Sequence, residues 1–341
     1  MNLSADPSSS EEMAPEEFDG GTAVVCVILG LSFLIGAPGN LLVIWTILRY
    51  VKQRSHTVVL ILHLAVADLL VLITLPLWIY SLARSWVFGQ ASCIALVYII
   101  SACMLSSIFF ITLMSVERFL AVCHPFMMMR WKTESALNKS IMFLWLLAFL
   151  LGVPALLTQP LEETGTEQCF MREFSSVTQA IVFLCLETLG GFVLPFIILS
   201  ICYCLIAAQL RRMRYKTKQK SMILVYAVVS AFALCWLPYH IINIIDLICI
   251  LKSGKEHECV PENIVFGSGA LVFISSSVNP VLYAFFAKNL KGSLEESRLV
   301  RLFQEMATHT SKLRELVVQQ QTGQMAACTQ IELISDLCDK N

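Results

Sequence analysis

Few residues of this sequence could do chemistry, and the most unusual is a carboxylate in apolar surroundings. Asp68 is the only acidic or basic residue of the apolar stretch 57–83, apart from a histidine. An ionised side chain inside a membrane is costly unless it is paired or solvated, and it usually has a function. Asp68 is therefore a candidate functional residue. The alternative, a polar contact that merely joins two helices, stays open at this point.

A second charged group stands where another apolar stretch ends. Residues 94–116 contain no charged side chain over 23 positions, and Glu117-Arg118-Phe119 follows directly. A helix of that length rises about 35 Å, enough to cross a bilayer. An acid and an arginine at this boundary either anchor the helix at the membrane surface or act as a functional pair.

Two proline-containing groups could act as hinges. Cys235-Trp236-Leu237-Pro238 and Asn279-Pro280-Val281-Leu282-Tyr283 both lie inside long apolar stretches. Proline removes a backbone hydrogen bond and permits a kink, so a kink beside a bulky aromatic ring allows two packings. Further prolines inside apolar stretches are Pro38, Pro76, Pro154 and Pro195. No clustered nucleophile, base or metal-ligand spacing occurs, and we expect no enzymatic activity.

Long apolar helices must position these residues. Of 341 residues, 57% are hydrophobic and 14% charged, whereas soluble domains have about 25% charged residues. Seven stretches are long enough to span a bilayer. They are 23–48, 57–83, 92–116, 140–159, 177–210, 221–251 and 263–287. We therefore expect an all-α membrane protein whose seven transmembrane helices form one bundle over residues 23–287.

The positions of Lys and Arg predict the orientation of the bundle. These residues concentrate after the first, third, fifth and seventh stretches and are sparse in the opposite loops, with a basic run at 211–220. Positively charged loops remain in the cytoplasm. We expect a multi-pass protein of the plasma membrane with an extracellular N-terminus and a cytoplasmic C-terminus.

The two ends of the chain lie outside the predicted bundle. Residues 1–22 are acidic and contain no Lys or Arg, which favours disorder, and Asn2 begins a glycosylation sequon. Apolar residues at helical spacing over 288–306 predict a short amphipathic helix on the inner membrane surface. The remaining 307–341 form a polar cytoplasmic tail.

Together these features closely resemble the rhodopsin-like (class A) G protein-coupled receptors, over about residues 23–300. Matching residues occur in order along the helices. They are Gly39-Asn40, Asp68, Cys93, Glu117-Arg118-Phe119, Pro125, Trp145, Pro195, Tyr203 and the two proline-containing groups. The resemblance implies a receptor that an extracellular agonist shifts toward a state that activates a heterotrimeric G protein.

The resemblance also implies residue roles. Cys93 and Cys169 are expected to form a disulfide, and Trp236 to lie beneath the ligand. An internal sodium ion would be held by Asp68, Ser107, Ser275 and Asn279. The activation switch would comprise Glu117, Arg118, Tyr203, Pro238, Asn279, Pro280 and Tyr283. Lys218 stands where many members place an acid that latches the arginine. We therefore expect Glu117 to hold Arg118 at rest, and basal signalling to be measurable.

Within the class, the stretches 186–196, 236–243 and 275–284 are most similar to the leukotriene B4 receptors of the chemoattractant group. This implies a small lipid agonist, leukotriene B4 or a related oxidised fatty acid. The implied ligand-binding residues are Arg172, Glu187, Trp236, His240 and Asn243. Arg172 is either the cation for a carboxylate or a solvated loop residue. His240 either binds a hydroxyl group or packs in the core.

Several positions depart from that group. Val97, Leu105 and Gln159 stand where related receptors place a histidine, a tyrosine and an arginine, and Asp246 adds negative charge. The alternative is a class A receptor for another lipid or a peptide chemoattractant.

The resemblance further implies inhibitory-class G proteins, chemotactic and inflammatory signalling, and arrestin and receptor kinases acting on the tail. Membrane lipids surround the bundle, and we expect no nucleic-acid partner. A transporter or channel would need internal repeats or charges lining a path, which this sequence lacks. A non-signalling scavenger is disfavoured by the Glu117-Arg118 pair.

Overall fold

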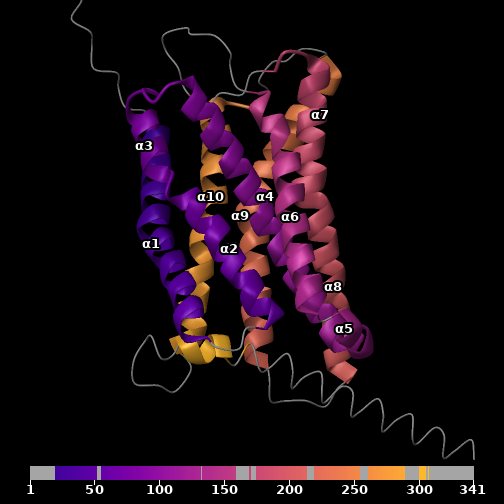
Figure 1. Ribbon diagram of the computed structural model, residues 1–341. Coiled ribbons are helices and arrows are strands. Elements are labelled where there is room, and N and C mark those ends of the chain that lie inside the picture. The colour runs from indigo at the N-terminus through magenta and orange to yellow at the C-terminus, as the bar shows by residue number, and fades with distance from the viewer. Residues whose placement is uncertain are drawn as a thin grey trace, which may run out of the picture.

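The computed structural model describes residues 20–51, 55–131, 133–158, 169, 174–212, 219–253, 260–288, 299–304 and 306. Within these ranges the chain forms helices and short connections, without a strand. The helices run alongside one another as one elongated bundle (Figure 1).

Seven helical columns make up the bundle, and each predicted apolar stretch falls in one of them. They are α1 (Gly20–Tyr50), α2 with α3 (His56–Leu72, Leu75–Ala83), α4 (Gln90–Cys123), α6 (Glu134–Leu156), α7 with η1 and α8 (Val177–Thr188, Leu189–Val193, Leu194–Arg212), α9 (Gln219–Ser253) and α10 (Glu262–Lys288). Six columns are long and apolar enough to cross a membrane by composition, and α10 packs against α1, α2 and α9. The predicted all-α seven-helix bundle is confirmed.

A further short helix, α5 (Pro125–Trp131), follows α4 and was not predicted. It lies at the lower end of the bundle in Figure 1, which we call the α5 end. The opposite end carries a disulfide between Cys93 and Cys169, and we call it the disulfide end.

Proline breaks the columns at only two of the expected places. Pro76 stands in the first turn of α3, after the turn at Ile73 and Thr74 that separates α3 from α2. Pro195 follows η1, a turn of π-helix. Such turns often mark functional positions. The other four prolines, Pro38, Pro154, Pro238 and Pro280, lie inside continuous helices.

The last described segment packs on the bundle at the α5 end. Leu302, Phe303 and Met306 are buried in the same apolar cluster as Tyr283, and the rings of Phe303 and Tyr283 lie 5.8 Å apart. The predicted amphipathic helix 288–306 falls partly outside the described residues, between 289 and 298. Its described part is helical, with its apolar side against the protein.

Glycines allow α1 and α10 to approach closely. A Cβ atom on Gly36 would lie 2.9 Å from Cα of Ser277, and one on Gly39 would lie 2.8 Å from the ring of Pro280. Across the same contact, Nδ2 of Asn40 donates to the carbonyl oxygen of Ser276 (3.0 Å), and it also donates to that of Gly36 in its own helix (2.9 Å). The small residues and Asn40 together fix where α10 lies beside α1.

We predict that Gly36→Ala lowers the stability of the bundle by about 1–3 kcal/mol, because the added methyl group meets the backbone of Ser277. Gly30→Ala is the matched control, since a Cβ there comes no closer than 4.0 Å to the Ile79 side chain. The midpoint of thermal unfolding of the purified protein in detergent measures both. Equal midpoints for the two variants would contradict the prediction.

Candidate functional site

A cavity of about 710 Å³ lies inside the bundle at the disulfide end. Its described lining comes from α1, α3, α4, α6, α7, η1, α9 and α10 and is mostly apolar. The polar side chains in it are Ser101, Glu187, Trp236, Tyr239, His240, Asn243 and Asp246. A pocket of roughly 300–1,000 Å³ with few polar groups is typical of small-molecule sites.

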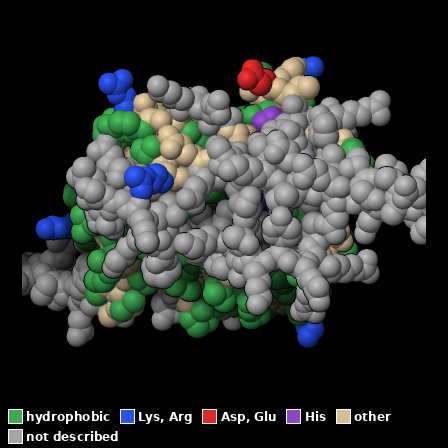
Figure 2. All heavy atoms as spheres, turned by 90° about the horizontal axis from the view of Figure 1, so that it is seen from below, with side chains coloured by type: hydrophobic (Ala, Val, Ile, Leu, Met, Phe, Trp, Pro, Cys, Tyr) green, Lys and Arg blue, Asp and Glu red, His purple; other side chains and the backbone are tan. Residues whose placement is uncertain are grey.

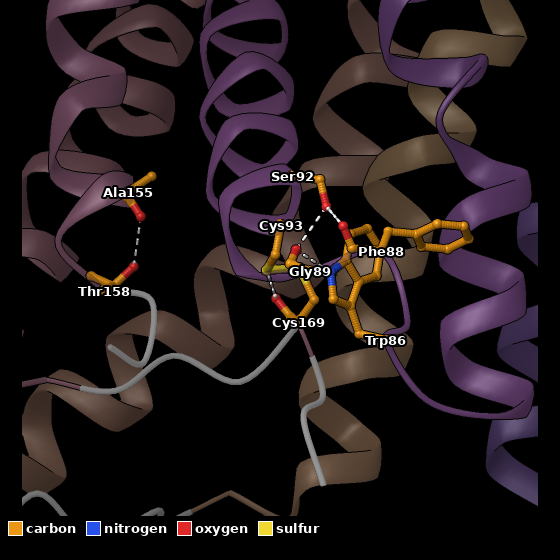
Figure 3. Close-up of a disulfide and its surroundings, with 8 residues drawn as sticks. All are labelled: Trp86, Phe88, Gly89, Ser92, Cys93, Ala155, Thr158 and Cys169. Carbon is orange, nitrogen blue, oxygen red and sulfur yellow. Dashed lines mark hydrogen bonds between the residues drawn. A yellow bond between two sulfur atoms is a disulfide. The ribbon is translucent and has the colours of Figure 1, made fainter. Parts of the chain in front are cut away.

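The disulfide borders this cavity. Cys93, in the first turn of α4, is bonded to Cys169, which itself lines the cavity, and the predicted pairing is confirmed (Figure 3). The turn before α4 is fixed by two hydrogen bonds to the carbonyl oxygen of Gly89, from Nε1 of Trp86 (2.8 Å) and Oγ of Ser92 (2.7 Å). Gly89 has a φ of 81°, a conformation that glycine adopts without strain.

A carboxylate joins α7 to α9 beside the cavity. Oε1 of Glu187 accepts a hydrogen bond from the Tyr239 hydroxyl (2.8 Å), and Oε2 accepts one from Nδ2 of Asn243 (3.0 Å). Asp246 lies about one turn beyond Asn243 and also lines the cavity. The described lining contains two acidic side chains and no Lys or Arg. Its polar corner therefore suits hydrogen-bond donors.

Stacked aromatic rings form another part of the cavity wall. The ring of His240 lies between Phe192 and Trp236, at centroid distances of 4.6 and 5.7 Å and nearly parallel to both. Nε1 of Trp236 donates to Oγ of Ser275 at 3.2 Å. A ligand that touches Trp236 therefore acts on the contact between α9 and α10. The structure places His240 in a packed stack that also borders the cavity.

Asp68 is buried outside the cavity lining, where it connects three helices. Its Oδ1 accepts from Oγ of Ser107 (2.9 Å) and its Oδ2 from Nδ2 of Asn279 (2.8 Å), which joins α2 to α4 and α10. The hydroxyl of Ser276 also faces this carboxylate. Ser275, expected beside Asp68, instead donates to the carbonyl oxygen of Val272 (2.7 Å) and accepts from Trp236.

The donor set around Asp68 suits a small hard cation. These partners are neutral hydroxyl and amide groups, and each brings an oxygen that could ligate a cation. Such hard oxygen donors suit a sodium ion, whose charge would balance the carboxylate.

At the α5 end, the Glu117 carboxylate pairs with a histidine of α2. Oε1 of Glu117 lies 3.1 Å from Nδ1 of His56. Arg118 is 1% exposed, and the charge of Glu117 acts on it. Glu117 has a hydrogen bond to His56, and its expected hold on Arg118 stays a prediction. The Tyr203 hydroxyl lies 3.0 Å from Oγ of Ser115.

Other predicted residues occupy these same regions or lie outside the described residues. Pro238 stands in α9 between Trp236 and Tyr239, and Pro280 follows Asn279 in α10. Arg172, Asn2 and the tail beyond 306 lie outside the described residues.

Sequence analysis did not identify two of these site residues, Tyr239 and His56. Tyr239 could have been found, since residues 239 and 243 share one face of a helix. His56 carries no sequence signal, because its partner is 61 positions away.

The sequence matches the family described as 7 transmembrane receptor (rhodopsin family) over residues 39–283. Similar proteins include human leukotriene B4 receptor 1, which is 33% identical over 299 residues and covers 84% of each chain. Rat leukotriene B4 receptor 2 is 35% identical over 318 residues, covering 89% of this chain and 86% of the relative. Rat somatostatin receptor type 4 is 29% identical over 316 residues, covering 88% and 80%.

We predict that Tyr239→Phe destabilises the protein by about 1–2 kcal/mol, because Glu187 loses the hydrogen bond from the Tyr239 hydroxyl. Combined with Glu187→Gln, the loss should be smaller than the sum of the single losses. Thermal unfolding of the four proteins measures this coupling. Tyr80→Phe, at a tyrosine that is 44% exposed, is the control. Additive losses would show that the contact contributes nothing.

Proposed function

Because this chain belongs to the rhodopsin family of seven-transmembrane receptors, we propose that an extracellular agonist binds in its cavity and activates a heterotrimeric G protein at the α5 end. The cavity and Arg118 lie in opposite halves of the bundle, and α9 contributes Trp236 to the cavity lining, two residues before Pro238. An agonist that binds one arrangement of α9 more tightly shifts the population toward it.

The agonist that the cavity supports best is leukotriene B4 or a related oxidised fatty acid. The observation that carries this proposal is an apolar cavity with one polar corner, at Glu187 and Asn243. These side chains can accept hydrogen bonds from hydroxyl groups of a ligand or donate hydrogen bonds to them. Two of the similar proteins bear the name of leukotriene B4 receptors. Arg172, outside the described residues, is our candidate for the cation that binds the carboxylate.

A second candidate is a ligand with an ammonium group, such as a peptide. The specific observation in its favour is that both charged side chains in the described lining, Glu187 and Asp246, are acidic. One of the similar proteins bears the name of a receptor for a peptide, somatostatin.

We also propose that the disulfide end is extracellular and the α5 end cytoplasmic, in the plasma membrane. Disulfides persist in oxidising compartments. Figure 2 views the bundle from below, and Lys and Arg side chains stand apart from one another along its outline. In the sequence, Lys and Arg concentrate after the first, third, fifth and seventh apolar stretches, as expected of cytoplasmic segments. Inhibitory-class G proteins, chemotactic signalling, and arrestin and kinases on the tail complete the proposal.

Cells that express the receptor should respond to leukotriene B4 in a cyclic-AMP or calcium assay. Arg172→Ala should lower the potency of leukotriene B4 by about tenfold or more, because a charge-assisted hydrogen bond is lost. The same substitution should hardly change the potency of the neutral methyl ester of leukotriene B4. Arg118→Ala is the control, since it should abolish signalling and leave surface expression and binding intact. A response to cationic peptides and none to leukotriene B4 would favour the second candidate.

We further propose that Asp68, Ser107 and Asn279 hold a sodium ion in the resting receptor. Sodium chloride should then raise the thermal unfolding midpoint of the purified protein above its value in choline chloride at equal ionic strength. Asp68→Asn should remove this difference and Ser107→Ala should reduce it. Ser106→Ala is the matched control, since its hydroxyl donates to the Ala102 carbonyl of its own helix. A sodium effect that survives Asp68→Asn would place the ion elsewhere.

A further inference from the structure

The pair of His56 and Glu117 lies beside the arginine that the proposed mechanism needs. A carboxylate accepts hydrogen bonds and donates none, so Nδ1 of His56 is the donor in its contact with Glu117. The two side chains are only 13% and 11% exposed. The contact is therefore sheltered from water, where hydrogen bonds to charged groups are stronger than at a surface.

Helix α2 is built to hold this contact. His56 is its first residue, and Oγ of Ser55 caps the helix by accepting from the backbone N–H of Val58 (3.4 Å). The Glu117 carboxylate thus contacts the ring of the first residue of α2, whose position the cap helps to fix.

Glu117 and Arg118 point in different directions because successive helical residues are about 100° apart. Glu117 faces α2, whereas Arg118 is buried where the charge of Glu117 and the Tyr203 phenol both act on it. The carboxylate is near enough to influence Arg118, but its hydrogen bond goes to His56. A change of side-chain rotamer would move it between the two.

We propose that His56 is a positioning residue that holds the Glu117 carboxylate on α2 and away from Arg118, and so sets how strongly the receptor signals without agonist. The proposal rests on the G protein coupling proposed above. When His56 cannot donate, Glu117 turns to Arg118 and stabilises the resting arrangement. Loss of His56 therefore lowers basal signalling, and loss of the carboxylate raises it.

The test is basal G protein activation, measured without agonist by energy transfer between labelled Gα and Gβγ subunits of all four G protein classes, at matched surface density. His56→Ala should lower the basal signal about tenfold or more, as expected for the loss of one charge-assisted hydrogen bond. His56→Asn keeps an N–H donor near the position of Nδ1 and should retain the wild-type level. His56→Gln places its donor one bond further out and should fall between them.

Glu117→Gln should raise the basal signal, and His56→Ala should have no further effect in that background. An unchanged or raised basal signal in His56→Ala, or the same decrease with and without the Glu117 carboxylate, overturns the proposal. If His56→Ala does not reach the cell surface, the basal signals of His56→Asn and His56→Gln are compared instead. A lower signal for His56→Gln supports the proposal, and equal signals overturn it. If the receptor does not respond to leukotriene B4, only the proposal about the ligand is contradicted. Silence of both wild type and Glu117→Gln in every class overturns the coupling and this inference together.

Discussion

The buried carboxylate of Asp68 is the constraint on which the rest of the bundle depends. A carboxyl group with 1% exposure is tolerated only if its oxygens have hydrogen-bond partners. Here they accept from α4 and α10, so three columns must keep their relative positions. The close contact of α1 with α10, through Gly36 and Asn40, extends the same constraint to a fourth column. Movement is therefore more easily accommodated by the columns outside this group.

Helix α9 is the clearest of those columns. Its described contacts with the fixed group include the hydrogen bond from Trp236 to Ser275, next to the residue that faces Asp68. On its other side it is joined to α7 by Glu187, through Tyr239 and Asn243. Both links lie within about two turns of Pro238, which interrupts the backbone hydrogen bonds of the helix. A ligand in the cavity can reach both links at once.

The seven helical columns could be predicted from apolar length, and the disulfide from the resemblance to a known family. The partners of individual side chains could not be predicted. Apolar length determines a transmembrane helix because backbone groups in lipid must bond within their own segment. Which of two adjacent residues faces a partner depends on helix rotation, and a shift of one residue turns a side chain by about 100°. Ser275 shows this, since its hydroxyl faces Trp236 and that of Ser276 faces Asp68. His56 and Glu117 show the same for helices that only the folded bundle brings together.

Three carboxylates, Glu187, Asp68 and Glu117, thus connect helices at successive levels of the bundle, and they differ in how many helices they join and in their donors. Asp68 is held by neutral donors on two helices. It can exchange these partners only if a cation compensates for the lost hydrogen bonds. Glu187 and Glu117 each hold a single neighbouring helix, through neutral donors and through one histidine. A single charge-assisted hydrogen bond is enough to change a two-state ratio about tenfold. Glu187 and Glu117 can therefore adjust the balance between two arrangements of the helices, while Asp68 keeps the positions of the three columns that both arrangements share.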